Sequence, residues 1–411
     1  MRWEEWGGAM STETEKIIEK LKCHVNACRA WLNSCKKCML VFHDDADGLS
    51  SAAITKTALE RMGIEVSLVC LEKLYHEAVE NVHKKSAAVV YCDLGSPHID
   101  VISKFTQRYT IILDHHDPIK RGVSNPEQAI RYTERVFDFN LEHLGLKGER
   151  DFSASMCCYL FARILNERNT DLSYISLIGA QELREKTFLY EEVLRESIAS
   201  GEVKANKGIT LLRLGMSVSK AFSLLQTLGS VGYYKNGPRL GVEACVSGFD
   251  ERVLRLAREL EVKRRKANAE VLEKIKRSGF NETKHIQYFD AGDTFSGMGS
   301  KVIGTLCSYL SYQRFVHPFK YIMGMMNLSR EIPGLGKLKK NYVKVSVRVT
   351  KRMREYIDKN KMPPCVEILT HACRGIGIAD GHAYAASCVV ERDKKALFLE
   401  RCERFIESRN N

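Results

Sequence analysis

The chain has 411 residues, a hydrophobic content of 44% and a formal net charge of +12 at pH 7. This composition indicates a globular protein of two or three domains. It excludes a membrane-spanning helix, because no apolar run approaches the ~20 residues that a bilayer requires. The positive charge favours an anionic partner such as nucleic acid. The first residues lack the basic region and apolar run of a signal peptide, so we expect the 14 cysteines to lie in a reducing cytoplasm.

The first part of the chain alternates between helical and strand patterns. Residues 12–36 predict one amphipathic helix. From 38 to about 116 the pattern runs strand, helix, strand, helix, strand, helix, strand. Such alternation predicts a doubly wound parallel sheet with right-handed crossovers, so the expected fold class is α/β. The segment 151–166 predicts a further helix, with Asp151 or Ser153 as its N-cap.

The middle of the chain changes character. Residues 183–228 predict several helices, and residues 229–248 predict weak strand or loop. Residues 251–279 predict a long, charged helix. Its charge run is typical of a solvated helix face, and we prefer that interpretation to a dedicated nucleic-acid arm.

A second, smaller α/β lobe is expected from about residue 286. Its predicted elements are strands at 286–289, 319–326 and 343–349, a helix at 301–312 and a terminal helix at 392–411. The predicted organisation is an N-terminal helix (1–36), a parallel-sheet domain (37–190), a helical connector (191–285) and the smaller α/β domain (286–411).

Four cysteines gather near the N-terminus: Cys23, Cys28, Cys35 and Cys38. They could form a zinc site, but zinc sites usually place short ligand pairs on turns. The surrounding sequence predicts helix without turn residues, so we favour ordinary reduced cysteines.

Acids and histidines follow three of the predicted strands directly. One strand ends in His43-Asp44-Asp45-Ala46-Asp47, the next in Asp93, and the third in the run 114–117, Asp-His-His-Asp. Open α/β sheets bind ligands outside the carboxyl ends of their strands. Mixed carboxylate and imidazole donors at such an edge suit manganese or another first-row ion.

Two divalent ions roughly 3.5–4 Å apart can stabilise the attacking and leaving oxygens of a phosphodiester. Asp45 and Asp47 are two positions apart and can face different ions, while Asp93 can bridge them. At the end of the third strand, one histidine ring can ligate an ion and the other can meet a phosphate.

Each of these residues also has an ordinary structural explanation. Asp44 and Asp45 could cap the helix that starts near Gly48, and His115 could be a surface histidine. The joint pattern on three strands favours a metal site. The amide groups of the helix after Gly48 would also suit an anion such as a scissile phosphate.

The same residues resemble the motifs of the DHH phosphoesterase superfamily. Residues 43–51 are similar to its first motif, residues 92–93 to its second, and Asp-His-His at 114–116 to the signature that names it. The C-terminal lobe looks like the DHH-associated substrate-binding domain. Its usual Gly-Gly-His-x-x-Ala-Ala-Gly run corresponds here to residues 380–387.

Segments 302–308 and 344–348 also resemble archaeal RecJ-like members, which act on single strands. His43 stands two residues before Asp45, closer than in the pyrophosphatase and oligoribonuclease branches. That spacing suits the RecJ-like branch. The resemblance covers both ends of the chain in the right order and leaves about 100 middle residues unmatched.

The resemblance implies a metal set, with two Mn²⁺ ions expected and Mg²⁺ or Co²⁺ as alternatives. His43 and Asp45 would hold the first ion. Asp47 and His115 would hold the second, and Asp93 would bridge.

The resemblance also implies a catalytic pair. His116 would face the scissile phosphate, and Asp114 would orient the cluster. The second ion normally receives another aspartate from a Gly-Ala-x-Gly-Asp type segment. Here Leu183 stands at that position and Glu182 one position earlier. Either Glu182 substitutes, or the second ion is weak, or activity has been lost, as in eukaryotic replication scaffolds of this fold.

The glycine-histidine run departs from the family as well. Asp380 replaces its first glycine and Ser387 its last, while Gly381 and His382 match. A carboxylate near a phosphate path would repel it unless Asp380 points away or helps a metal. Close backbone approach at Gly381 and a hydrogen bond from His382 remain expected for substrate.

Residues 330–361 hold eleven basic and three acidic residues. Lys344, Ser346 and Arg348 alternate on one face of a predicted strand, as a groove for a single-strand backbone requires. Tyr342 and Tyr356 could stack on bases. A merely solvated basic face is the alternative. Lys344 and Arg348, with Gly381 and His382, are the predicted substrate-binding residues.

Together these features predict a metal-dependent phosphodiesterase, an exonuclease on single-stranded DNA or RNA in repair or replication. The expected partners are single-stranded nucleic acid and a helicase or replisome protein, with no membrane. Two alternatives stay open. One is a phosphodiesterase for short oligonucleotides or cyclic dinucleotides, and the other is an inactive replication scaffold.

Overall fold

The computed structural model describes residues 12–120, 126–183 and 185–410. The chain divides into two compact units. Unit 1 comprises residues up to 229 together with 236–257 and 333–335, and unit 2 comprises 230–235, 258–332 and 336–411. None of the described helices combines the length and the apolar character that crossing a membrane requires.

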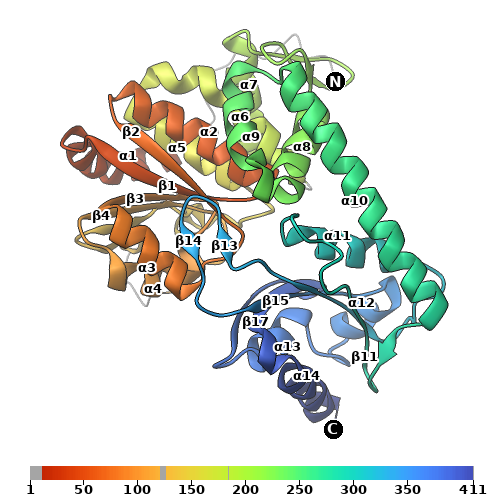
Figure 1. The fold of residues 1–411 in the computed structure, drawn as a ribbon. Helices are drawn as coiled ribbons and strands as arrows, with labels where there is room; N and C mark the ends of the chain where they lie inside the picture. Colours follow the sequence, from red (N-terminus) through yellow and green to blue (C-terminus); the bar gives the residue numbers. More distant parts are fainter. Residues whose placement is uncertain (1–11, 121–125, 184, 411) are drawn as a thin grey trace. The chain divides into compact units, whose positions relative to one another are not determined.

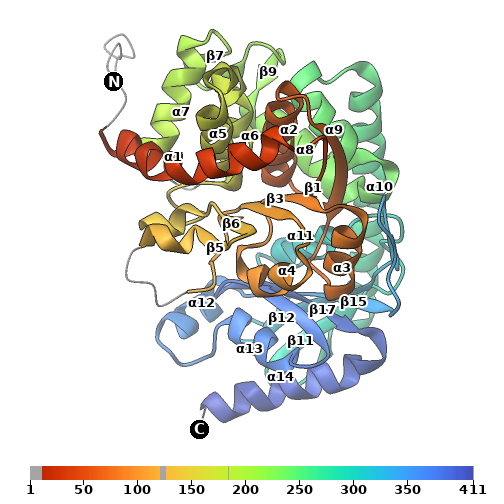
Figure 2. The same cartoon turned by 90° about the vertical axis from the view of Figure 1, so that its left-hand side faces the viewer.

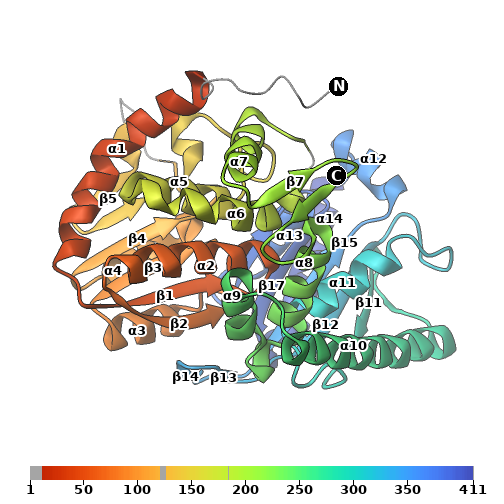
Figure 3. The same ribbon diagram turned by 90° about the horizontal axis from the view of Figure 1, so that it is seen from above.

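Unit 1 is built on a six-stranded sheet in the order β2-β1-β3-β4-β6-β5. All its pairings are parallel except that of β5 with β6. The predicted parallel sheet is therefore confirmed, and Figure 3 shows β4, β3, β1 and β2 side by side in that order. The strands are β1 (Lys37–His43), β2 (Glu65–Leu71), β3 (Ala88–Cys92), β4 (Tyr109–Leu113), β5 (Arg131–Thr133) and β6 (Val136–Asp138).

Helices cover both faces of this sheet, as a doubly wound arrangement requires (Figure 2). The central strands are buried almost along their whole length, which matches their continuous apolar sequences. On one face Trp31 stacks on Tyr109 with ring centroids 4.0 Å apart. One face carries α1 (Thr12–Asn33), α2 (Ala46–Arg61) and α5 (Ala154–Leu165), and the other carries α3 (His76–Lys85) and α4 (Ile99–Phe105).

The helix expected at 151–166 begins after Ser153, whose hydroxyl accepts the amide N–H of Met156 at 3.4 Å. Ser153 is therefore the N-cap, and Asp151 is not. Asp151 instead accepts the Lys147 amide N–H at 2.8 Å in the preceding turn.

The remaining part of unit 1 corrects two predictions, because residues 203–217 also hold three short strands where only helices were expected. Residues 229–248 are largely the helix α9 rather than weak strand or loop. The helix forms because its glycines allow close packing: a Cβ on Gly241 would lie 2.4 Å from Leu49. Tertiary contact thus overrides a glycine-rich sequence. The elements are α6 (Ser173–Gly179), α7 (Phe188–Ala199), α8 (Val218–Gln226), α9 (Gly237–Ser247) and a small sheet of β7 (Val203–Ala205), β8 (Ile209–Leu211) and β9 (Met216–Ser217).

The long charged helix is confirmed as α10 (Glu251–Ser278), green in Figure 1. It carries a stripe of buried apolar residues at helical spacing, and charged residues occupy the rest of its surface. This distribution supports the interpretation of its charge run as a solvated helix face.

Unit 2 contains a second six-stranded sheet in the order β10-β11-β12-β15-β17-β16. Only β11 and β12 pair in parallel; the other pairings are antiparallel. α13 (Cys365–Ala372) and α14 (Lys395–Asn410) pack on one face and bury its apolar side chains. The strands are β10 (Asn281–Glu282), β11 (Ile286–Asp290), β12 (Tyr321–Asn327), β15 (Tyr342–Arg348), β16 (Gly377–Gly381) and β17 (Ala385–Glu391).

The other face of this sheet is partly covered by α11 (Lys301–Leu310). A Cβ on Gly304 would lie 3.3 Å from Ser346 Oγ, so the helix approaches β15 closely. The short helix α12 (Lys351–Asp358) follows β15. A hairpin of β13 (Glu331–Ile332) and β14 (Gly336–Lys337) precedes β15 in the chain.

The four N-terminal cysteines do not gather around one point. Cys28 and Cys38 are buried, whereas Cys23 is exposed on α1. Burial raises the pKa of the Cys38 thiol to about 12, with a smaller contribution from Cys35. In the described part of the chain, no metal-type group includes any of them.

A buried histidine gives this fold a testable pH dependence. His83, on α3, is 1% exposed, and its Nε2 lies 3.2 Å from the Tyr91 hydroxyl. Burial lowers the pKa of His83 to about 4. In the unfolded chain His83 therefore takes up a proton below pH ~6.5, whereas in the folded chain it takes up that proton only near pH 4. Stability should fall by about 3 kcal/mol as the pH drops through this window.

Urea unfolding at pH 7 and pH 4 measures this effect against His83→Gln, which cannot titrate but can still bond Tyr91. The variant should lose less stability over this pH range than the native chain. Equal losses in both proteins would show that His83 is not the group responsible.

Candidate metal centre

The first strand of unit 1 delivers a histidine and an aspartate to the edge of the sheet. His43 is the last residue of β1, and Asp45 is the N-cap of α2. Asp45 Oδ1 accepts the Gly48 amide N–H at 2.9 Å, so the capping explanation holds. Capping also leaves Asp45 Oδ2 3.1 Å from His43 Nδ1. The two roles are therefore compatible.

Asp93 stands at the centre of the site. It follows β3 directly with a backbone φ of 60°, a left-handed conformation that few residues other than glycine adopt. Its Oδ2 lies 3.5 Å from His43 Nδ1, and its Oδ1 lies 3.1 Å from His115 Nε2. Strain of this kind concentrates at functional sites. The conformation here aims one buried carboxylate at histidines from two different strands.

The strand β4 is followed by a carboxylate, Asp114, that holds a neighbouring histidine in place. Asp114 Oδ1 accepts a hydrogen bond from His116 Nδ1 at 2.7 Å, and its Oδ2 accepts the Ser96 amide N–H at 2.9 Å. Burial opposes the charge on Asp114, but His116 outweighs it and holds the pKa of Asp114 well below its usual range. Burial also lowers the pKa of His116, yet the Asp114 charge leaves that pKa raised overall. The predicted orienting role of Asp114 fits this geometry.

Two groups of possible ligands share Asp93. The first is His43, Asp45 and Asp93, and the second is Asp93, Asp114, His115 and His116. Within each group the ligand atoms lie within 4.8 Å of one another. The structure thus brings together six of the seven predicted metal and catalytic residues.

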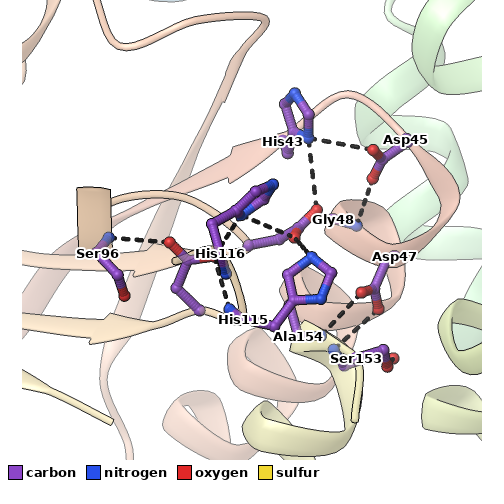
Figure 4. Close-up of polar contacts among 12 residues, drawn as sticks. His43, Asp45, Asp47, Gly48, Ser96, His115, His116, Ser153 and Ala154 are labelled. Carbon is purple, nitrogen blue, oxygen red and sulfur yellow. Dashed lines mark hydrogen bonds and ion pairs between the residues drawn. The ribbon is translucent and has the colours of Figure 1, made fainter. Parts of the chain in front are cut away.

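Asp47 is the predicted residue that joins neither group among the described residues. It is 4% exposed and accepts the amide N–H of Ala154 at 2.8 Å and that of Ser155 at 2.9 Å. Figure 4 shows Asp47 turned toward the start of α5. Its carboxylate therefore satisfies two amide groups at a helix N-terminus, where negative charge is favourable.

Glu182 joins neither ligand group among the described residues. Its side chain is exposed, and Gln226 Nε2 donates to its Oε1 at 2.9 Å. Leu183 offers no ligand atom. The second group also has fewer side chains available as metal ligands, because Asp114 and His116 are hydrogen-bonded to each other. Asp93 and His115 are its remaining donors.

The residues of the first group fit a divalent ion. Imidazole and carboxylate donors suit first-row ions, and Asp93, which both groups share, has one buried oxygen without a hydrogen bond, Oδ1 on the side of His115. Burial and the negative charges of Asp45 and Asp47 raise the pKa of Asp93, although His43 opposes them. A cation would relieve this accumulation of buried negative charge.

Sequence reasoning missed the residues that support the histidines. Ser96 Oγ donates to Asp138 Oδ1 at 2.7 Å, and Asn140 Nδ2 donates to the His116 carbonyl at 2.7 Å. His143 Nε2 lies 2.9 Å from Asp138 Oδ2. Asp138 ends β6 just as Asp93 follows β3, so its position after a strand was the available signal.

The predicted substrate residues lie in unit 2. Lys344 is only 3% exposed and donates to Ser387, and Arg348 is half-buried and donates to Ser308 Oγ at 2.9 Å. They share one strand face as predicted, but Lys344 is not on an exposed surface. Gly381 has φ of 128°, and a Cβ there would lie 2.5 Å from Ala386 Cα. His382 is exposed at the turn that follows.

Residues 37–176 match the model of the DHH family, N-terminal domain. This match covers about a third of the chain, and that part is similar to the N-terminal domain of the DHH family. An uncharacterized protein of Methanocaldococcus jannaschii is 30% identical to this chain over 171 residues, 41% of this chain and 36% of the relative. The chain therefore spans little more than a third of that relative's length.

Solved structures show the same fold. RecJ from Thermus thermophilus, in complex with Mn²⁺, matches with a TM-score of 0.64 and 15% identity, covering 95% of this chain and 55% of the RecJ chain. CDC45 from Entamoeba histolytica matches with a TM-score of 0.55 and 10% identity, over 95% of this chain and 99% of the other. At these identities the similarity concerns the fold. A RecJ-like α/β fold is confirmed.

Proposed function

We propose that this protein is a divalent-metal-dependent phosphodiesterase that digests single-stranded DNA or RNA from an end, in repair or replication. The observation that carries the proposal is the pair of ligand groups joined at the buried Asp93. DHH-family phosphoesterases and the RecJ fold support the coarser statement, a hydrolase of phosphoester bonds.

His43, Asp45 and Asp93 would hold the tighter ion, and Asp93 with His115 a weaker one. A bound divalent ion supplies Lewis-acid stabilisation of the phosphate and a nucleophile at neutral pH. His116 is fixed through Nδ1 by Asp114, so its Nε2 is the atom that can donate a hydrogen bond to a phosphate oxygen. We propose Mn²⁺ as the ion, with Mg²⁺ or Co²⁺ as alternatives.

Unit 2 offers features that suit a single strand. Phe319 and Tyr356 are both partly exposed, with ring centroids 5.1 Å apart. Lys361 Nζ lies 5.6 Å from the Tyr356 ring centre. Aromatic faces beside cations bind bases by stacking and phosphates by charge. The basic residues of segment 330–361 other than the buried Lys344 support a polymeric substrate over a dinucleotide.

An inactive scaffold is the second candidate. It is favoured by Leu183 and by the hydrogen bond that keeps Glu182 with Gln226. The fold similarity to CDC45 is consistent with it. A helicase or replisome protein would be the partner in either case. We place the protein in a reducing cytoplasm, because its 14 cysteines are free thiols.

The test uses Mn²⁺ and end-labelled single strands of DNA and RNA, from dinucleotides to long oligomers. We expect laddering of long strands that stops on chelation and is absent in Asp93→Ala. Cleavage restricted to the shortest strands would contradict the polymer substrate and favour the small-substrate alternative. Strand binding without any cleavage would contradict catalysis and favour the scaffold.

A further inference from the structure

The sheet of unit 2 carries a row of polar side chains across three adjacent strands. Ser346 on β15 is directly opposite Ser387 on β17, and Ser387 is directly opposite Asp380 on β16. Directly opposed residues of antiparallel strands project to the same face. The face is the one opposite the apolar core, which holds the alternate residues Val345, Val347 and Cys388. We call Ser346, Ser387 and Asp380 the polar row.

Lys344 connects this row to a positive charge. Its Nζ donates to Ser387 Oγ at 3.0 Å, and Ser387 Oγ donates to Asp380 Oδ1 at 3.2 Å. Lys344 is 3% exposed, whereas Ser387 and Asp380 are half-buried. A buried ammonium is thus linked through one hydroxyl to a half-buried carboxylate. The carboxylate offsets the charge that Lys344 would otherwise present.

Asp380 and Ser387 both stand where the resembled run has glycine. They occur here as a hydrogen-bonded pair rather than as two unrelated replacements. Between them the turn keeps Gly381, which its φ of 128° requires. The exposed His382 directly follows that glycine. The close backbone approach of the motif is therefore retained. Beside it, two glycines without side chains are replaced by a carboxylate and a hydroxyl.

A carboxylate accepts hydrogen bonds from hydroxyl groups and repels phosphate. We infer that the Asp380–Ser387–Lys344 network makes this motif select a nucleic-acid end that carries a sugar hydroxyl over an end that carries a phosphate. This inference rests on the proposed function, because it assigns the preferred substrate of the same protein. Asp380 is the specificity-determining residue, and Ser387 and Lys344 position it.

The experiment measures binding of the full chain to internally labelled single strands by fluorescence anisotropy, with a chelator present so that no cutting occurs. The strands have one sequence and carry a hydroxyl or a phosphate at the 5′ or 3′ end. At one of the two ends, 5′ or 3′, we expect a terminal phosphate to weaken binding about tenfold relative to a terminal hydroxyl at that same end. Asp380→Asn should reduce that ratio to about twofold or less.

Two further variants separate charge from structure. Asp393→Asn removes one exposed carboxylate of the same unit and should keep the native ratio. Ser387→Ala breaks the link between Lys344 and Asp380 and should lower the ratio while leaving the Asp380 charge in place.

Equal binding of both kinds of end by the native chain would overturn the inference, as would an unchanged ratio in Asp380→Asn. A chain that selects hydroxyl ends but never cuts would support this inference and contradict the proposed catalysis. Failure to bind any single strand would contradict both.

Discussion

Asp93→Asn is expected to abolish tight Mn²⁺ binding and to stabilise the metal-free protein. Asparagine has nearly the same shape and tolerates the left-handed φ of 60° at this position. Burial and neighbouring carboxylates raise the pKa of Asp93, so its charge at pH 7 costs folding free energy. Removing that charge should add about 1–3 kcal/mol to the stability of the metal-free chain.

The same change removes the ligand that both groups share, so cleavage should fall by 10³-fold or more, on the order of one lost metal site. Calorimetric Mn²⁺ titration and urea unfolding measure the two effects. Asp100→Asn, which alters an exposed carboxylate on α4, is the matched control and should change neither. A variant that loses stability or keeps tight Mn²⁺ binding would refute the assignment of Asp93.

Asp47→Ala should have the opposite effects: it should lower the stability of the metal-free protein and leave Mn²⁺ binding in place. Its carboxylate accepts two amide N–H groups at the start of α5 and is almost fully buried. Without it both amides lose their partner inside unit 1, at a cost on the order of 3–5 kcal/mol. Asp47→Asn keeps one acceptor oxygen and should lose about half as much.

Urea unfolding of metal-free protein checks this order, with Asp100→Ala as the control. Folded Asp47→Ala should still bind one Mn²⁺ at His43, Asp45 and Asp93. If Asp47→Ala is as stable as the control but binds no Mn²⁺, then Asp47 is a metal ligand and not a support for α5.

Much of the candidate site could be predicted from the sequence because its residues follow buried strands. An apolar run that stops at an acid places that acid at the edge of a parallel sheet, whatever the loops do. His43, Asp93 and Asp114 are found there. The alternation of strands and helices likewise predicted the order of elements in unit 1, because the hydrophobic period of each element can be read from neighbouring residues alone.

Orientation within the site could not be predicted in this way. Asp47 turns toward amide groups 107 residues later in the chain, which no local pattern reveals. The pairing of Glu182 with Gln226 spans 44 residues and is equally non-local. The helix α9 and the short strands β7 to β9 were missed because glycine-rich or very short segments lack a readable period.

The central claim is that a divalent ion binds at the group joined by Asp93. Crystals soaked in Mn²⁺, with data collected near the manganese absorption edge, test it most directly. The account predicts a strong anomalous peak within coordination distance of His43, Asp45 and Asp93, and a weaker peak beside His115. Well-ordered side chains with no peak at Asp93 would contradict it.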